Sequence, residues 1–165
     1  MARNEPLRNS AIAAALEQGL ARRNYGDIEA LLVRSGGLPG PRPNWGLAWA
    51  FAGAVAAAGN RADGLVAELL AIDASRAPAR SAVEFLPAVG AFCVASRALA
   101  APALDPELDG LMALAEDTRH LVREAVVLAL VQIGVERSDD LLASLEPWIQ
   151  QYLPAATALT AIATR

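Results

Sequence analysis

Apolar residues recur every three or four positions along most of the chain, which is the spacing of one face of an α-helix. The clearest case is residues 107–134, where the apolar stripe stops at Asp117-Thr118-Arg119-His120 and then resumes. Gly134 suits the end of the second stripe, because glycine adopts a left-handed cap conformation without steric cost. The pattern therefore predicts two helices joined by a short polar turn.

The same periodicity predicts a leading helix over residues 4–23 and further helix pairs on both sides of the central one. Residues 35–44, SGGLPGPRPN, are rich in proline and glycine and are expected to form one long loop. Asp27 is expected to cap the short helix that precedes this loop. Pro87 and Pro154 suit the first turns of later helices, whereas Pro147 is expected to kink or shorten the helix over residues 138–151.

The second helices of three pairs share a sequence pattern. They start near Leu86, Leu121 and Leu153, so their separations are 35 and 32 residues, and LPAVGAFCVASR aligns with LPAATALTAIAT without a gap. Such periods are typical of helical repeats, which bury their apolar faces by stacking. We therefore expect an all-α, right-handed α-solenoid in a single domain, 1–165, with pairs at roughly 26–59, 62–101, 105–134 and 138–165.

The segment DTRHLVREAVVLALVQIG resembles the second half of a HEAT repeat. It has a turn aspartate, Asp117, a Val122-Arg123 helix start, small residues within the helix and a final Gly134. The similarity is closest in this pair, weaker over residues 138–165 and weakest over 27–100. The resemblance implies a curved stack of helix pairs that is used mainly for binding other proteins, and it implies no reaction.

Composition supports a helical protein and narrows its class. Alanine, the residue with the highest helix propensity, occurs 38 times. All 14 basic residues are arginine, which is most simply explained by the GC-rich genome of a bacterium. The net charge of −4 argues against a nucleic-acid-binding protein, since phosphate recognition needs a basic face.

The chain shows no signal for export or for a membrane span. Its N-terminus lacks the apolar segment of a signal peptide, and the apolar part of its longest uncharged run, residues 43–60, is shorter than the about 20 residues that a spanning helix needs. The one cysteine, Cys93, cannot form an intramolecular disulfide, and a reducing compartment suits it. We therefore expect a cytoplasmic protein.

No motif for a metal, a cofactor or a reaction occurs in the sequence, so we expect neither metal nor cofactor and lean against an enzyme. His120 is the only histidine and falls in a polar turn, and Cys93 lies in an apolar context typical of a buried residue. Asp117 and Arg123 flank the central turn, and we interpret them as a structural ion pair that fixes the helix pair.

An apolar line on the helix after the long loop is the strongest candidate for a binding surface. Trp45, Trp49 and Gly53 are spaced one helical turn apart, and aligning Gly59 with Gly134 places Trp49 opposite Glu124, an outward position. This face is either covered, by the 35–44 loop or by another copy of the chain, or open to a partner helix. The expected concave working surface comprises Trp45, Trp49, Val89, Arg119, Arg123 and Glu124.

The function expected from these features is a protein-interaction or scaffold module that binds a protein or peptide, or self-associates. Two alternatives remain from the resemblance to other helical-repeat proteins. One is a glycosylase of the DNA-alkylation-repeat type, against which the net charge counts. The other is a lyase or chaperone of the phycobilisome-lyase type, for which no residue gives specific support.

Overall fold

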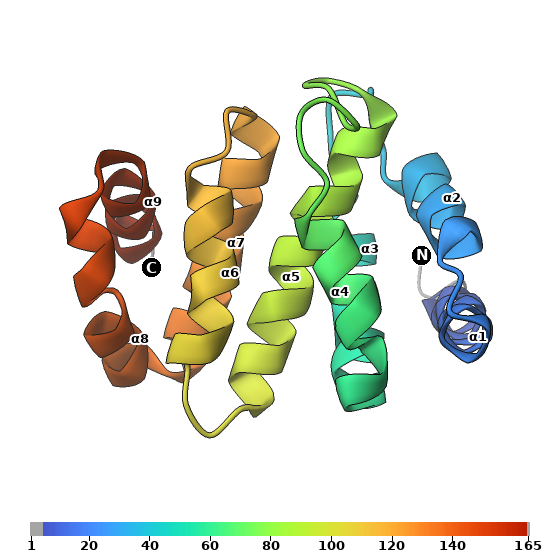
Figure 1. Ribbon diagram of the computed structural model, residues 1–165, viewed down its shortest axis with the longest axis horizontal. Helices are drawn as coiled ribbons and strands as arrows, with labels where there is room; N and C mark the ends of the chain where they lie inside the picture. The colour runs from blue at the N-terminus through green and yellow to red at the C-terminus, as the bar shows by residue number, and fades with distance from the viewer. Residues whose placement is uncertain (1–4, 165) are drawn as a thin grey trace.

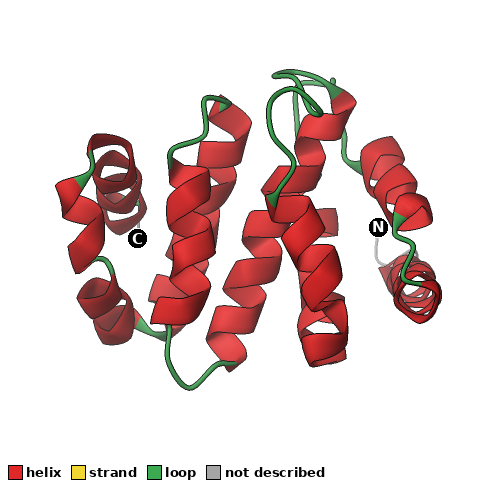
Figure 2. Cartoon of the chain, in the orientation of Figure 1, coloured by secondary structure: helices red, strands yellow, loops and turns green. Residues whose placement is uncertain are grey.

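The apolar stripes of the sequence form α-helices in the computed structural model, and residues 5–164 contain no β-strand (Figures 1 and 2). The structure describes residues 5–164, with the side chains of residues 10–105, 107–151 and 153–164. The all-α prediction is thereby confirmed for this part of the chain. Asn4 and Arg165, the expected ends of the first and last helices, lie outside the described residues.

A leading helix is followed by four helix pairs. The leading helix is α1 (Glu5–Arg22), and the pairs are α2 (Gly26–Ser35) with α3 (Trp45–Ala58), α4 (Asp63–Leu70) with α5 (Phe85–Ala100), α6 (Asp105–Ala115) with α7 (His120–Glu136), and α8 (Ser138–Ser144) with α9 (Tyr152–Ala163). Short 3₁₀ helices are η1 (Gly59–Ala62), η2 (Ala82–Glu84) and η3 (Glu146–Gln150).

The second helices pack against one another in chain order: α3 against α5, α5 against α7, and α7 against α9. The helices α4 and α6 pack against α5 as well, so α5 has neighbours on several sides (Figure 1). Every side chain from Phe85 to Ala95 is consequently buried. Residues 82–100 are apolar and long enough to cross a membrane by length and composition, but 72% of the most apolar window is buried within the structure.

Asparagines, rather than the expected aspartate, supply the polar contacts at the starts of α2 and α3. The side chain of Asn24 accepts a hydrogen bond from the Gly26 N–H at 3.0 Å, and Asp27 lies inside the first turn. The prediction that Asp27 caps α2 is therefore wrong. Asn44 caps α3 by accepting from the Leu47 N–H at 3.1 Å, and its amide donates to the Ser35 carbonyl at 3.0 Å, which closes the long loop.

The prolines act as predicted. Pro87 and Pro154 are each the third residue of their helix, where the missing N–H breaks no intrahelical hydrogen bond. The helix that begins at Ser138 ends at Ser144 and is followed by η3, which contains Pro147. Since proline cannot donate to the preceding turn, Pro147 shortens this helix as expected.

A substitution at Leu130 tests whether α7 is packed between its neighbouring helices. Its side chain is fully buried. Leu130→Ala should destabilise the protein by roughly 2–5 kcal/mol, as truncation of a buried leucine does. Val135→Ala is the control on the same helix, because Val135 is 70% exposed and its truncation should change stability by about 0.5 kcal/mol or less. Urea denaturation measures both, and equal losses would contradict this packing.

Candidate functional site: a groove at the start of helix α7

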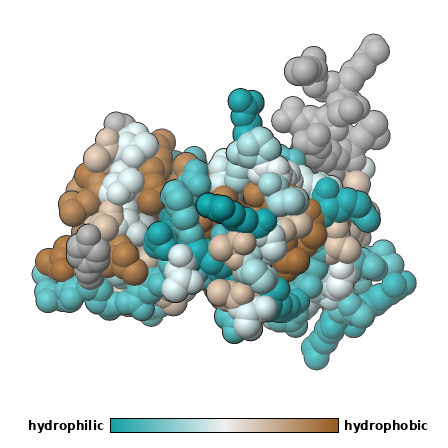
Figure 3. All heavy atoms as spheres, turned by 90° about the horizontal axis from the view of Figure 1, so that it is seen from above, coloured by the Kyte–Doolittle hydropathy of each residue, from teal (hydrophilic) through white to brown (hydrophobic). Residues whose placement is uncertain are grey.

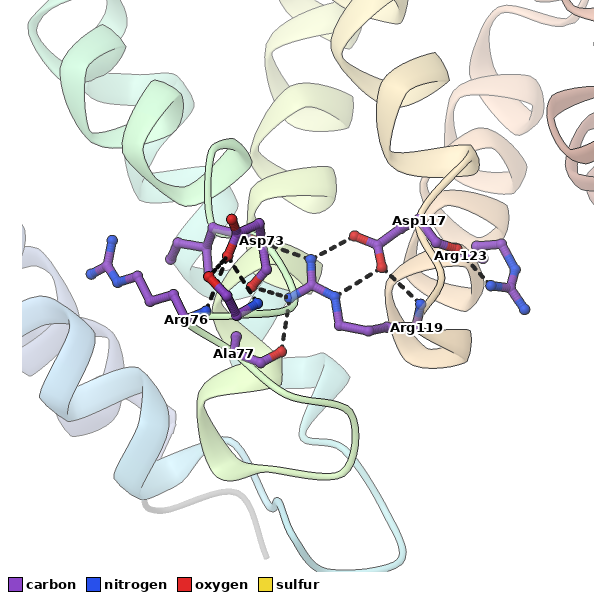
Figure 4. A network of polar contacts seen from close by, with 8 residues as sticks. Asp73, Arg76, Ala77, Asp117, Arg119 and Arg123 are labelled. Atoms are coloured by element: carbon purple, nitrogen blue, oxygen red, sulfur yellow. Dashed lines mark hydrogen bonds and ion pairs between the residues drawn. The ribbon is translucent and has the colours of Figure 1, made fainter.

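A buried arginine holds the turn before α7 against the preceding helix pair (Figure 4). The Arg119 side chain is 2% exposed. Its Nε and Nη2 donate to the two carboxylate oxygens of Asp117, with Nε to Oδ1 at 2.8 Å. Its remaining N–H groups donate to the backbone oxygens of Ile72 at 2.8 Å, Ala77 at 3.0 Å and Asp73 at 3.1 Å. All five N–H groups of this guanidinium are thus satisfied.

The turn that contains Asp117 also orients its carboxylate toward Arg119. It accepts from the Arg119 backbone N–H at 2.8 Å, which is the local hydrogen bond that aspartate makes in turns. Burial raises the pKa of Asp117, but hydrogen bonds from Arg119 and the charges of Arg119 and Arg123 outweigh it and lower the pKa overall. Arg123 donates to the backbone oxygen of Asp117 at 2.6 Å. The predicted Asp117–Arg123 ion pair is therefore wrong, because Arg119 occupies the carboxylate.

The loop over residues 71–81, whose carbonyl oxygens bind Arg119, is also held by hydrogen bonds within the loop and by an ion pair to α2. The Asp73 carboxylate accepts from the Ser75 hydroxyl at 2.6 Å and from the N–H groups of Ser75 and Arg76 at 2.9 and 3.0 Å. Those hydrogen bonds, the one from the Ser75 hydroxyl first, lower the pKa of Asp73. The Arg76 side chain reaches both carboxylate oxygens of Glu29 on α2 at 2.7 Å. The loop therefore joins α2 to the turn before α7.

An open pocket of about 630 Å³ lies where this turn meets the long loop. Its walls come from the proline-rich segment of residues 38–43, from residues 79–84 and from the first turn of α7. Glu84 is 3% exposed and its carboxylate accepts from the backbone N–H of Arg80. The polar lining residues are Arg80, Glu84, Thr118, Arg119, His120 and Glu124.

A second pocket of about 290 Å³ lies between α7 and α9 and shares His120 and Glu124 with the first. Arg123, Val127 and Leu153 also line it, with small residues of α9. We call the two pockets together the α7 groove. It combines apolar contact area with hydrogen-bond donors and acceptors of both charges, which suits recognition of another polypeptide.

Three of the six predicted surface residues lie in this groove. Arg119 and Glu124 line the first pocket, and Arg123 and Glu124 line the second. Arg119 is nevertheless buried, and its N–H groups are all taken by Asp117 and backbone oxygens, so it has no free donor for a partner. Val89, which was expected on the concave surface, is fully buried in α5, where neighbouring helices cover it.

The two tryptophans of the predicted line pack within the monomer. Trp45 lies 6.2 Å from Phe85 and 5.3 Å from Phe92 between ring centroids, and Trp49 meets Phe92 edge to face at 4.5 Å. Both tryptophans are half-buried. Phenylalanines of α5 therefore cover part of this face within the monomer. Gly53, the third residue of the line, is exposed.

Sequence reasoning missed Arg80, His120 and the proline-rich wall as parts of one site. The long loop is recognisable from its composition, but its position beside α7, about 80 residues away, has no local signal in the sequence. His120 was interpreted as a polar turn residue, and it does sit exposed at the start of α7.

The described residues offer little for metal or thiol chemistry. Among them, no group of three or more histidine, cysteine, aspartate and glutamate side chains is placed to hold a metal ion. Cys93 is fully buried in α5, and burial raises its pKa to about 12. It is therefore a protonated thiol at neutral pH, whereas nucleophilic cysteines act as thiolates.

Comparison of this chain with protein-family models, with curated proteins and with solved structures finds no match.

Arg119 should contribute more to stability than Arg76, an exposed arginine that also forms an ion pair with a carboxylate. Arg119→Ala should cost roughly 3–5 kcal/mol, because it leaves a partly buried carboxylate and several carbonyl oxygens without their donor. Arg119→Lys should restore only part of this loss, since lysine has three donors and no planar fork. Arg76→Ala is the control and should cost under about 1 kcal/mol. Similar urea midpoints for all three variants would refute the role of Arg119.

The lowered pKa of Asp117 predicts an acid-dependent loss of stability. A carboxyl group with a folded-state pKa below its unfolded value of about 3.9 stabilises the fold above that value, and this stabilisation is lost as the pH falls through the folded pKa. Asp117→Asn should therefore be less stable at neutral pH and should show a shallower fall in melting temperature below about pH 4. Glu68→Gln, on the exposed side of α4, controls for removing one acid. If the melting temperatures of wild type and Asp117→Asn fell equally with pH over this range, the lowered pKa of Asp117 would be contradicted.

Proposed function

We propose that this chain is a right-handed, HEAT-like α-solenoid that acts as a protein-interaction module and binds a polypeptide in the α7 groove. The order of helix contacts supports the architecture, because each second helix packs against the next second helix along the chain. The observation that carries the binding proposal is the groove itself, two adjoining pockets of about 630 and 290 Å³ that share His120 and Glu124.

The chemistry of the groove fits a polypeptide segment better than a phosphate backbone. Arg80 and Arg123 are balanced by Glu84 and Glu124, and Arg119 is paired with Asp117, so the groove lacks the excess of positive charge that nucleic-acid binding needs. The exposed Glu124 carboxylate accepts hydrogen bonds from peptide N–H groups, while arginine and histidine donate to peptide carbonyl oxygens. Leu121, Val127 and Leu153 supply apolar contact area beside these polar groups.

The groove adds no residue that favours the two alternatives. Trp45 and Trp49 pack on Phe85 and Phe92 and do not line the groove. No residue of the groove points to pigment chemistry, and we keep an interaction module of the cytoplasm as the proposed function.

Glu124 is the residue with which to test the groove, because it is exposed and lines both pockets. Immobilised protein is used to capture a partner from an extract of the source organism, and the dissociation constant of the purified partner is then measured. Glu124→Arg should weaken this binding by about tenfold or more, as loss of a central contact does. Glu68→Arg makes the same charge change on the outer face of α4 and should bind as wild type does.

Circular dichroism and thermal melts establish that both variants remain folded. Equal affinity of wild type and Glu124→Arg for the partner would refute the α7 groove as the binding site. Capture of duplex DNA with a steep dependence on salt would instead support the glycosylase alternative.

A further inference from the structure

The exposed large apolar side chains of the described residues all lie near the C-terminal end of the array. They are Val135, Leu142, Ile149, Leu153, Leu159 and Ile162. Seen from above, hydrophobic residues gather at the end of the molecule that carries α8 and α9 (Figure 3). Such a concentration of apolar surface marks an interaction site rather than the scattered apolar residues of an ordinary surface.

An acidic pocket of about 320 Å³ opens beside this surface, between α6 and the α8–η3 segment. Its carboxylates are Asp105, Asp109 and Glu146, and Trp148, which is 2% exposed, also lines it. Asp105 accepts a hydrogen bond from the Ser144 hydroxyl. Among the described side chains, Asp109 and Glu146 form no ion pair, so two negative charges are left for a cation from outside.

The geometry of η3 places Ile149 beside the acidic pocket. Glu146 and Ile149 are three residues apart in this 3₁₀ helix, where side chains at this spacing lie directly above one another. Ile149 is 66% exposed. A ligand that covers Ile149 therefore reaches the carboxylate of Glu146. Leu142, 49% exposed, lies in α8 next to Ala143, which lines the pocket, so Leu142 borders the pocket without lining it.

The charge of this end of the molecule selects among occupants. Residues 135–164 contain four acids, Glu136, Asp139, Asp140 and Glu146, and one arginine, Arg137. Arg137 is engaged by Asp140 and by backbone oxygens. A symmetric contact with a second copy would therefore set carboxylates against carboxylates, which opposes association. A basic partner meets the opposite charge.

We propose that the surface of Leu142 and Ile149, with the adjoining acidic pocket, docks a basic amphipathic helix of a protein partner. The apolar face of that helix lies on Leu142 and Ile149. An arginine or lysine at its edge enters the pocket, where it pairs with Asp109 and Glu146 above the indole of Trp148. This site lies apart from the α7 groove, so a partner can use either or both.

The test uses three fluorescently labelled synthetic peptides and fluorescence anisotropy. The first is a helix with leucine on one face and arginine on the other. The second has the same composition in scrambled order, and the third replaces arginine by glutamate. We expect the first peptide to bind about tenfold or more tightly than either of the others, because only it matches both the apolar surface and the charge.

Variants locate the binding. Asp109→Asn with Glu146→Gln should weaken binding of the first peptide by about tenfold and reduce its salt dependence, and Ile149→Ser should weaken it by a similar factor. Glu68→Gln removes an exposed acid from α4 and should bind the peptide as wild type does. Thermal melts of each variant establish that the fold is retained.

Three results would overturn the proposal. One is equal binding of the amphipathic and the scrambled peptide, which would show general charge attraction only. Another is binding that survives both the carboxylate and the Ile149 changes. The third is a concentration-dependent dimer of the protein alone, seen by sedimentation and abolished by Ile149→Ser, which would make a second copy the occupant.

Discussion

Two junctions between helix pairs depend on arginine side chains that satisfy backbone carbonyl groups. Leaving such groups buried without a hydrogen-bond donor is costly. In the loop after α4, the carbonyls of Ile72, Asp73 and Ala77 all accept from Arg119. One side chain thereby satisfies the loop of the second pair and fixes the start of α7 in the third.

Arg137 repeats this solution at the next junction. It stands just before α8, donates to the carbonyl oxygen of Ala98 in the last turn of α5 at 2.9 Å and to that of Ala101 just after α5 at 2.6 Å, and pairs with Asp140 at 2.7 Å. In each case an arginine at the start of one helix binds carbonyls at or after the end of the α-helix three positions earlier in the chain, with an aspartate holding its fork. Lysine, with a single nitrogen, cannot serve this geometry. The arginine-only composition therefore has structural use at these two positions, whatever its origin in genome composition.

Short-range patterns in the sequence were sufficient for most of the fold. Apolar spacing gave the helices, and Pro87, Pro147 and Pro154 act where their lack of an N–H predicts. The polar contacts were less accessible. Asp117 was expected to pair with Arg123 because the two residues flank the turn before α7. Arg119 instead turns inward to the buried carbonyls beyond α4, and its guanidinium takes the Asp117 carboxylate. The carbonyl partners of Arg119 lie more than 40 residues away, so no local pattern identifies them.

The same reasoning explains why the candidate binding surface was only partly predictable. Repeat alignment placed Trp49 at an outward position, and Val89 was expected on the concave surface of the second helices. The helices are not equivalent, because α5 has packed neighbours on several sides, and even its first turns are buried. Glu124 is exposed and Arg123 is half-buried, because α7 keeps part of its first turns open beside the long loop and α9.

Burial along the array thus determines where a partner can bind. The centre is closed: Phe85 and Phe92 of α5 fill the space against Trp45 and Trp49, and Cys93 and Val89 have no exposed surface. Open surface with both apolar and charged groups occurs toward the C-terminal half, at the α7 groove and at the Leu142–Ile149 surface with its acidic pocket. The two differ in charge, since the groove balances arginine against glutamate while the second site is acidic. A partner that bridged them would gain affinity from two linked contacts, and neither contact alone would need to be tight.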